Sequence, residues 1–581
     1  MKKAQRRDPR TTRLGLSLGL GLLLTACGTS PGTGTGAPAT LTPAVGASLR
    51  QCDTLASEFR FDQTTIDSAA PVAAGGLVLA GQPVAAHCLV KGQMHKRKGS
   101  DGRDYAIGFE MRLPQAWNGR FYHQGNGGLD GAVRPAEGAL GGGPLTGALV
   151  QGFAVISSDA GHTGAQTPYF GLEPQARLDY GYQAVAKLTP MAKALIASAY
   201  GKGPDRSYIG GCSNGGRHAL VAASRLGDQY DGYLIGAPGY RLPNAALAQL
   251  WGAQRWTPLA TPGATVKHPL NPNANIPDLA SALTAPERQS VARAVLNRCD
   301  ALDGLRDGLV QATQACQAAF DVVRDVPACS GARDGTCLTP AQKDTLAQVQ
   351  AGGKTANGQA IYSAFPHDTG IAGNNWATWK FVNAVALDPL SVGTVFTAPP
   401  AAPVNVASAN IDALLPALST TSDTYRESGL SLMGPPGHEK PDNLLPLRAR
   451  GAKLVLYHGV SDAIFSAEDT RQWVERVNRS QGGKAADFVR YFPVPGMNHC
   501  SGGPATDQFD LLGPLVKWVE QGVAPQAVTA SARGAGNAGG ANPELPADWS
   551  ATRSRPLCAY PTVAQYTGTG PVETASSFSC R

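Results

Sequence analysis

Charged residues are scarce in this chain. Only 16% of its 581 residues are Asp, Glu, Lys or Arg. The formal net charge is +7, but six basic residues and one acidic residue among the first 13 supply +5, which leaves +2 for the rest of the chain. A protein that binds nucleic acid needs a concentrated basic surface to neutralise phosphates. The low and balanced charge therefore argues against a nucleic-acid partner.

Long apolar runs and metal-binding motifs are missing as well. No internal stretch is long and apolar enough to span a bilayer, and neither H-E-x-x-H nor a cluster of histidines occurs, which argues against a metal-dependent hydrolase. Hydrophobic residues nevertheless make up 43% of the chain, enough for a large core shared between two globular parts. Gly (70) and Pro (43) are plentiful, so we expect a loop-rich fold.

The N-terminus has the layout of an export signal. A basic region is followed by the short apolar run "LGLSLGLGLLL" and then by "LTAC", which ends at Cys27 and resembles the lipobox of bacterial lipoproteins. We predict a lipoprotein signal peptide over 1–26, lipidation of Cys27 and a flexible Gly/Thr/Pro/Ala tether over 27–49. Gly28, where an Asp would favour inner-membrane retention, suggests an outer-membrane lipoprotein in the periplasm or at the cell surface. The alternative is an ordinary secretory signal and a secreted protein.

Ten cysteines remain once the lipobox cysteine is set aside, and an even number in an exported chain favours five disulfides. Proximity in the sequence suggests four pairs and leaves two distant cysteines for the fifth. The expected pairs are Cys52 with Cys88, Cys299 with Cys316, Cys329 with Cys337, Cys558 with Cys580, and Cys212 with Cys500. For the last pair, two buried free thiols are the alternative.

The segment "RSYIGGCSNGGRHALVAASRLGDQYDG" has the pattern of a strand, a glycine-rich turn and a helix. It contains G-x-S-x-G, with Ser213 at the centre. In α/β-hydrolases this motif forms the nucleophile elbow, where small flanking residues allow the sharp turn that exposes the serine hydroxyl. We therefore interpret Ser213 as a catalytic nucleophile; a purely structural turn is the alternative.

An α/β-hydrolase supplies its acid and then its base later in the chain, each after a strand. "AKLVLYHGVSDAIFS" places Asp462 after one strand pattern, and "FVRYFPVPGMNHCSGG" places His499 after another. We predict that His499 is the general base and that Asp462 fixes its tautomer and stabilises its cation. Because Cys212 precedes Ser213 and Cys500 follows His499, a bridge between these cysteines would fix the distance between nucleophile and base.

The oxyanion of such a reaction needs backbone N–H donors. One is expected from Asn214, the residue after the nucleophile, and the other from a glycine-rich loop after an earlier strand. "WNGRFYHQGNGGLDG" offers Gly125, Gly127 and Gly128, of which we favour Gly128. A tight turn without a role in catalysis is the alternative.

Together these stretches resemble the tannase and feruloyl esterase family. Its members carry a Cys-Ser pair, an Asp and a His-Cys pair, which here correspond to the stretches around Ser213, Asp462 and His499. The segments "ISSDAGH", "FGLEPQARLDYGY", "GAPGY" and "CDALDGLRDG" resemble other motifs of the family. The similarity runs from about residue 50 to the C-terminus. Among its members the chain is most similar to the bacterial branch that acts on terephthalate monoesters. The resemblance implies the α/β class, with an α/β-hydrolase core interrupted by a large inserted lid. The implied boundaries are 50–238 and 443–581 for the catalytic domain and 239–442 for the lid.

The resemblance also implies a structural calcium ion in the lid and no organic cofactor. The implied ligands are the carboxylates of Asp300, Asp303 and Asp307 and the carbonyls of Leu305 and Leu309. Three carboxylates crowded into one turn repel one another unless a cation lies between them, and all-oxygen ligation favours Ca²⁺. The alternative is a solvated acidic turn stapled by a disulfide.

Substrate contacts belong to the lid and to the loop after the acid. Trp379 corresponds to an aromatic residue that stacks on substrate in the terephthalate branch, and Phe465 could form the opposite wall. His458 either lines the pocket or packs against its strand. No Arg lies between Lys380 and Arg426, where the resemblance implies an Arg that holds the substrate carboxylate, and Lys lacks the guanidinium fork. Ferulate or gallate esters therefore fit as well as terephthalate esters.

The leading hypothesis is an exported serine carboxylic-ester hydrolase that acts on small aromatic acid esters through an acyl-enzyme. The alternative is a catalytically silent, calcium-stabilised lipoprotein that binds aromatic ligands. A peptidase on the same fold is a further possibility, because acyl transfer does not by itself select esters over amides. The expected partners are a small aromatic ester and, only through the lipid anchor, a membrane.

Overall fold

A computed structural model of the chain describes residues 41–434 and 444–581. The predicted signal peptide, the lipobox cysteine and most of the tether lie outside these residues. No helix of the described part combines the length and the apolar character needed to cross a membrane.

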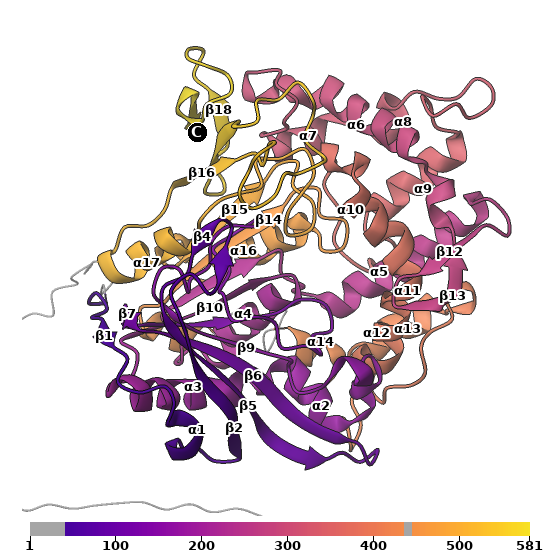
Figure 1. Ribbon diagram of the computed structural model, residues 1–581. Coiled ribbons are helices and arrows are strands. Elements are labelled where there is room, and N and C mark those ends of the chain that lie inside the picture. The colour runs from indigo at the N-terminus through magenta and orange to yellow at the C-terminus, as the bar shows by residue number, and fades with distance from the viewer. Residues whose placement is uncertain (1–40, 435–443) are drawn as a thin grey trace, which may run out of the picture. The chain divides into compact units, whose positions relative to one another are not determined.

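A nine-stranded mixed sheet forms the centre of the molecule, in the order β15-β14-β11-β10-β8-β9-β6-β5-β2. The six strands from β15 to β9 run parallel, whereas β6, β5 and β2 continue the sheet with antiparallel neighbours (Figure 1). The strands are β2 (Thr64–Val72), β5 (His87–Lys98), β6 (Asp104–Pro114), β8 (Arg120–Gln124), β9 (Ala154–Ser158), β10 (Arg206–Cys212), β11 (Gly232–Gly236), β14 (Lys453–Gly459) and β15 (Val489–Val494). The carboxyl ends of the parallel strands share one edge, where ligands bind in open α/β sheets.

The parallel strands are apolar on both faces because helices cover both. In β14, Leu454 and Leu456 belong to the hydrophobic cluster on one face, and Val455 and Tyr457 belong to the cluster on the other. This alternation follows from the two-residue period of a strand. The first face packs against α3 (Ala184–Tyr200), α4 (Asn214–Arg225) and α16 (Ala467–Ser480), and the second packs against α17 (Leu512–Gln521).

The chain between β11 and β14 forms a mostly helical insert with its own hydrophobic cluster. Its helices, pink to orange in Figure 1, lie to one side of the sheet. They are α5 (Leu242–Trp256), α6 (Ala285–Cys299), α7 (Thr313–Ala319), α8 (Val322–Asp325), α9 (Pro340–Gln350), α10 (Asn374–Ala377), α11 (Ala384–Ala386), α12 (Asp388–Ser391), α13 (Ile411–Ala417) and α14 (Gly429–Met433), with the hairpin β12 (Thr265–His268) and β13 (Asn271–Pro277). The helix that follows, α15 (Leu445–Ala449), packs with α4 on the face of the central sheet. The amide of Gln249 on α5 donates to the carbonyl of Ala463, 2.7 Å away, and so joins the insert to the loop after β14.

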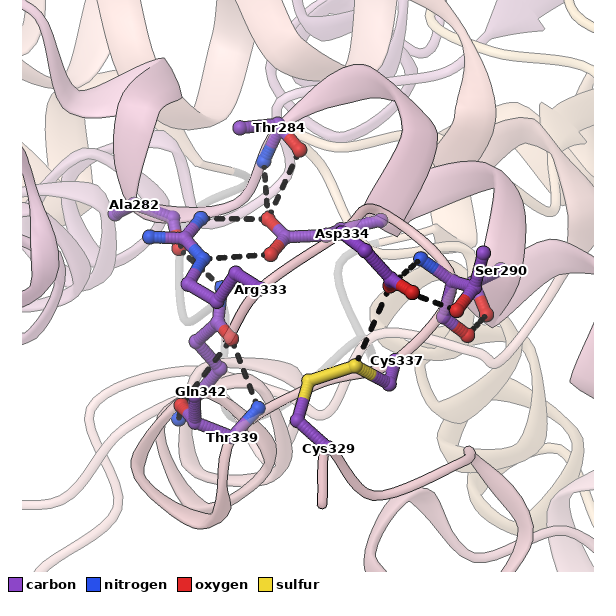
Figure 2. The surroundings of a disulfide bond; sticks show 11 residues. Ala282, Thr284, Ser290, Cys329, Arg333, Asp334, Cys337, Thr339 and Gln342 are labelled. Atoms are coloured by element: carbon purple, nitrogen blue, oxygen red, sulfur yellow. Dashed lines mark hydrogen bonds and ion pairs between the residues drawn. A yellow bond between two sulfur atoms is a disulfide. The ribbon is translucent and has the colours of Figure 1, made fainter. Parts of the chain in front are cut away.

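The loop closed by the disulfide between Cys329 and Cys337 lies beside the N-terminal ends of α6 and α9 (Figure 2). Between Cys329 and Cys337, Arg333 forms a bidentate ion pair with Glu287 in the first turn of α6, with both N···O distances 2.7 Å. The amide of Gln342 at the start of α9 donates to Ala282 before α6, 2.8 Å away. Both helices begin with a capping box, which satisfies backbone N–H groups that would otherwise lack partners.

Shorter elements complete the described chain. They are α1 (Leu55–Glu58), α2 (Pro174–Leu178), β1 (Ala47–Ser48), β3 (Val78–Leu79), β4 (Gln82–Pro83), β7 (Ala116–Trp117), β16 (Ala527–Ser531), β17 (Ser554–Cys558), β18 (Ala564–Tyr566) and β19 (Phe578–Cys580). Residues 41–434 and 444–581 contain five disulfides, and they join the cysteines in the five pairs expected from the sequence: 52–88, 212–500, 299–316, 329–337 and 558–580.

Candidate active site

Ser213 lies in a sharp turn between β10 and α4, at the carboxyl edge of the sheet. Its backbone has φ +64° and ψ −128°, a conformation that non-glycine residues rarely adopt. A Cβ at Gly211 or Gly215 would collide with the backbone carbonyl of Gly125, and one at Gly216 with the carbonyl of Gly236. The glycines of "GGCSNGG" are therefore required by close backbone approach, and the strained turn presents the Ser213 hydroxyl at the surface of the core.

Ser213, His499 and Asp462 form a continuous hydrogen-bonded chain. The Ser213 Oγ lies 2.8 Å from His499 Nε2, and His499 Nδ1 lies 2.7 Å from Asp462 Oδ2. The other oxygen of Asp462 accepts hydrogen bonds from the backbone N–H groups of Ile464 and Phe465, at 2.9 and 3.0 Å. Ser213 and His499 are 286 positions apart in the sequence. The structure thus brings the three residues together in the arrangement expected of a nucleophile, a base and an orienting acid.

His458 does not line the site, so the first of its two alternatives, that it lines the pocket and contacts substrate, is wrong. Its ring is fully buried; Nε2 lies 3.2 Å from Asp462 Oδ2 and 2.9 Å from the carbonyl of Phe465, and Nδ1 lies 2.8 Å from Thr470 Oγ1. Burial alone would raise the pKa of the Asp462 carboxyl, but the charge of His499 and the hydrogen bonds from both histidines hold it below its usual range. His458 packs behind the acid and helps to keep it ionised.

Two aromatic rings flank the imidazole of His499. Trp379 from the insert and Phe465 from the loop after β14 both meet it edge to face, with centroid distances of 5.0 and 5.3 Å. Phe465 is only 3% exposed, whereas Trp379 is half-buried. Phe465 therefore mainly fixes the orientation of the imidazole, and Trp379 leaves ring surface accessible beside it.

The glycine-rich loop after β8 lies against the nucleophile turn. The N–H of Gly125 donates to the carbonyl of Gly210 at 2.9 Å, and the position of a Gly125 Cβ would be 2.8 Å from Gly215 Cα. Gly128 has φ +65° and open space around it. Within the described residues, neither its N–H nor that of Asn214 has a hydrogen-bond acceptor. Both predicted oxyanion donors are therefore available to a ligand.

The disulfide between Cys212 and Cys500 links the turn of the nucleophile to the loop of the base. It joins residues 288 positions apart, with a Cα–Cα distance of 6.0 Å. Cys500 itself has φ +65°, so the His499 loop is held in an unusual backbone conformation next to the bridge. The cysteines that flank Ser213 and His499 form a covalent clamp between the two loops.

The acidic turn after α6 is held by hydrogen bonds and by the C-terminal strand β17. Asp300 Oδ1 accepts from the N–H groups of Asp307 and Gly308, and Asp307 Oδ2 pairs with the buried Arg555. Asp303 Oδ2 is buried without a partner among the described residues; burial, together with the charges of Asp307 and Asp300, raises the pKa of this carboxyl to about 7. Among the described residues, no three His, Cys, Asp or Glu side chains converge closely enough to hold a metal ion.

Two further carboxylates organise the site, and neither belongs to a recognisable sequence motif. Asp368 Oδ2 accepts from Ser461 Oγ at 2.9 Å and from the N–H of Gly496 at 2.7 Å, which joins the loops that carry the acid and the base. Glu544 accepts from the N–H of Asn374 at 2.7 Å and from the N–H of Gly503 at 2.6 Å. Each acts across more than 40 residues of sequence, so only the folded chain identifies it.

Comparison with known proteins places this site in a family. The model of "Tannase and feruloyl esterase" matches residues 88–581. The chain belongs to the tannase and feruloyl esterase family. It is 38% identical over 534 residues to mono(2-hydroxyethyl) terephthalate hydrolase from Piscinibacter sakaiensis, covering 85% of this chain and 84% of that protein. It is also 27% identical over 503 residues to a probable feruloyl esterase B-1 from Aspergillus fumigatus, covering 81% and 82%.

The fold agrees with this membership. The crystal structure of feruloyl esterase B from Aspergillus oryzae superposes with a TM-score of 0.71 at 24% identity, covering 91% of this chain and 99% of that one. The protein therefore has the α/β-hydrolase fold predicted from its sequence. As a member of the tannase and feruloyl esterase family, it is a carboxylic-ester hydrolase, and its substrate is a small ester.

Proposed function

We propose that this family member is a serine esterase that hydrolyses small aromatic acid esters through a covalent acyl-enzyme. The hydrogen-bonded chain from Ser213 through His499 to Asp462, with distances of 2.8 and 2.7 Å, carries the proposal. It supplies a nucleophile, a base and an orienting acid at one accessible point.

In the first half of the reaction, Ser213 Oγ attacks the ester carbonyl carbon while His499 Nε2 takes the hydroxyl proton. The carbonyl π bond breaks and its electrons become an oxyanion, which we propose the N–H groups of Gly128 and Asn214 bind. The tetrahedral intermediate collapses, the C–O bond to the alcohol breaks, and His499 gives its proton to the departing oxygen. Asp462 stabilises the imidazolium throughout.

In the second half, water replaces the alcohol. His499 takes a proton from the water, whose oxygen attacks the acyl carbon and forms a second oxyanion in the same donor pair. When this intermediate collapses, the bond between Ser213 Oγ and the acyl carbon breaks, and the proton returns to Ser213. The products are the free aromatic acid and the regenerated enzyme.

The acid side of the substrate is proposed from the surroundings of His499. The half-buried ring of Trp379 offers an apolar surface for an aromatic acyl group. Lys380, the nearest basic residue in sequence, does not offer its ammonium group there, because it is 3% exposed and its Nζ lies 3.5 Å from the centroid of Phe365. Burial lowers the pKa of Lys380 to about 7. These features favour aromatic acyl groups without a free carboxylate.

A turnover panel tests this assignment. We expect the purified protein to hydrolyse methyl ferulate, methyl gallate or bis(2-hydroxyethyl) terephthalate with a lower KM than mono(2-hydroxyethyl) terephthalate, whose carboxylate lacks a guanidinium partner from residues 381–425. Nitrophenyl acetate reports the reaction without an aromatic acyl group. If the monoester has the lowest KM, another cation recognises its carboxylate; if only nitrophenyl acetate reacts, the aromatic acyl specificity is wrong.

A structural calcium ion in the turn after α6 is part of the proposal. The three carboxylates of Asp300, Asp303 and Asp307 do not converge on one point among the described residues, so the ion would have to draw them together. The chemistry of the donors fits, because the carbonyls of Leu305 and Leu309 lie in the same turn and Asp303 Oδ2 is buried without a partner among the described residues. These residues would hold the ion, which would neutralise their mutual repulsion. The turn lies far from the triad in sequence and has no proposed part in the chemical steps.

Removal of calcium is expected to destabilise the fold. A chelator should lower the Tm by several degrees, because the carboxylates then repel one another, and added Ca²⁺ should restore it. Differential scanning fluorimetry with EDTA measures the shift, and Asp303→Asn serves as the variant that no longer responds to the chelator. A Tm that is the same with and without EDTA, with no metal in elemental analysis, would contradict the calcium proposal.

Export and lipid anchoring are proposed from the N-terminal residues and the disulfides. Five disulfides in one chain fit an oxidising compartment. The lipobox at Cys27 and the Gly after it support an outer-membrane lipoprotein. Mass spectrometry of the mature N-terminal peptide decides between a lipidated Cys27 and a plain secretory cleavage.

A further inference from the structure

The side chain of Asn214 is held at both ends inside the protein. Its Oδ1 accepts a hydrogen bond from Arg217 Nε at 2.6 Å, and its Nδ2 donates to Asp130 Oδ1. The residue is 2% exposed. The backbone N–H of Asn214 is one of the two proposed oxyanion donors, so the side chain of the same residue fixes how that peptide group is turned.

Arg217 is the fully buried anchor of this arrangement. Its Nη1 and Nη2 donate to the carbonyls of Gly181 and Tyr180 at 2.6 and 3.0 Å, and the guanidinium lies over the Tyr180 ring, 4.8 Å from its centroid. These carbonyl and ring partners carry no full charge. The carboxylate whose charge acts on Arg217 is Asp130, which is hydrogen-bonded to Asn214. A buried cation is stable only with such compensation, so this contact is costly to break.

Asp130 connects the anchor to the loop of the second oxyanion donor. It lies two residues after Gly128, with a side chain that is 2% exposed and a left-handed backbone at φ +47°. Its N–H donates to the carbonyl of Gly127 at 3.2 Å, and Tyr180 Oη donates to the carbonyl of Gly128 at 3.4 Å. Burial raises the pKa of the Asp130 carboxyl, while the Arg217 charge and the Asn214 amide oppose that shift.

We propose that Arg217, Asn214 and Asp130 form a buried brace that positions the two N–H donors of the oxyanion hole relative to each other. Arg217 and Asp130 are positioning residues, since each acts through Asn214 or the Gly128 loop and not on the substrate. The inference rests on the proposed serine esterase mechanism and extends it. Donors that are fixed before the reaction lose no free energy to reorganisation when the oxyanion forms, which is why rigidity at this point matters for rate.

The decisive variant is Asn214→Ala, which keeps the backbone N–H and removes only the brace. We expect kcat to fall about 10- to 100-fold, because a donor displaced by a fraction of an ångström stabilises the transition state less, while KM changes less than about threefold. The rate at which a fluorophosphonate labels Ser213 should fall in parallel, because the phosphoryl oxygen occupies the same hole. A purely structural role would lower the Tm without this split between kcat and KM.

A reciprocal exchange separates the brace from simple loss of packing. Asn214→Asp alone places two carboxylates side by side and should lower kcat at least as much as Asn214→Ala. Adding Asp130→Asn restores one amide, one carboxylate and the pairing with Arg217. We therefore expect the double variant to recover kcat to within about threefold of the wild-type value, a non-additive result typical of directly coupled residues. If Asn214→Ala does not fold, this pair of variants provides the same comparison.

The control is Asn244→Ala on α5, which removes another buried Asn side chain, 8% exposed, whose amide donates to the carbonyl of Ile361 at 2.9 Å. It should lower the Tm and leave kcat and the labelling rate unchanged. If the wild type is labelled by the fluorophosphonate and hydrolyses ester, and Asn214→Ala does both at the wild-type rates, the brace is wrong and the esterase mechanism stands. If the wild type neither labels nor turns over any ester, the mechanism and the brace both fail.

Discussion

Replacing Ser213 with Ala is expected to lower kcat for an activated aromatic ester by about 10⁴- to 10⁶-fold. The change removes the nucleophile that lies 2.8 Å from His499 Nε2 and leaves a small side chain in the strained turn. The hydrogen bond to the imidazole is lost, but no buried charge is left without a partner. Steady-state hydrolysis of a nitrophenyl ester measures the loss, and the thermal unfolding transition should remain close to that of the wild type.

A matched control lies on the helix that follows the nucleophile. Ser224→Ala removes a hydroxyl from α4 that donates a hydrogen bond to the carbonyl of Val221, 3.1 Å away. This variant should keep the wild-type kcat. Turnover by Ser213→Ala at more than about one-hundredth of the wild-type rate would show that another group is the nucleophile.

Removing the bridge between Cys212 and Cys500 is expected to affect stability and rate together. The double variant Cys212→Ala/Cys500→Ala should lose about 2–5 kcal/mol of unfolding free energy, because the bridge closes a loop of 288 residues. It should also lose about 10-fold or more in kcat, since Ser213 and His499 are no longer held at a fixed separation. Chemical denaturation and ester turnover measure the two losses on the same preparation.

The disulfide between Cys329 and Cys337 provides the comparison. It closes a loop of only eight residues in the insert, near the starts of α6 and α9 (Figure 2). Its removal should cost less stability, because a shorter loop constrains the unfolded chain less, and should leave kcat unchanged. Equal kcat for both double variants would mean that the bridge beside the triad stabilises the fold without setting the geometry of the reaction.

The loops that carry the triad are joined by more than this disulfide. Asp368 connects the acid loop to the base loop, and Glu544 connects the base loop to α10 of the insert. The insert also supplies Trp379, which meets the imidazole directly. The insert, which the sequence predicts to be a lid, is thus in direct contact with the triad, because its residues contact His499 and the loops that carry His499 and Asp462.

The sequence by itself was enough to predict that Ser213, Asp462 and His499 lie together. Each follows a recognisable strand pattern, and the fold places the carboxyl ends of such strands at one edge, where the structure joins the three side chains by hydrogen bonds. The pairing of ten cysteines also followed largely from distance along the chain, since close neighbours form short loops readily.

Only the tertiary structure decided how these residues are supported. From the sequence, His458 could either line the pocket or pack against its strand, and no local pattern distinguishes the two; in the structure it is buried behind Asp462. Asn214 contacts Asp130, 84 positions before it, and Arg217, three positions after it. The contact with Asp130 depends on which loops the sheet brings together. A motif records the residues that react, whereas the partners that hold them are set by burial and by the need to satisfy every buried charge and hydrogen-bonding group.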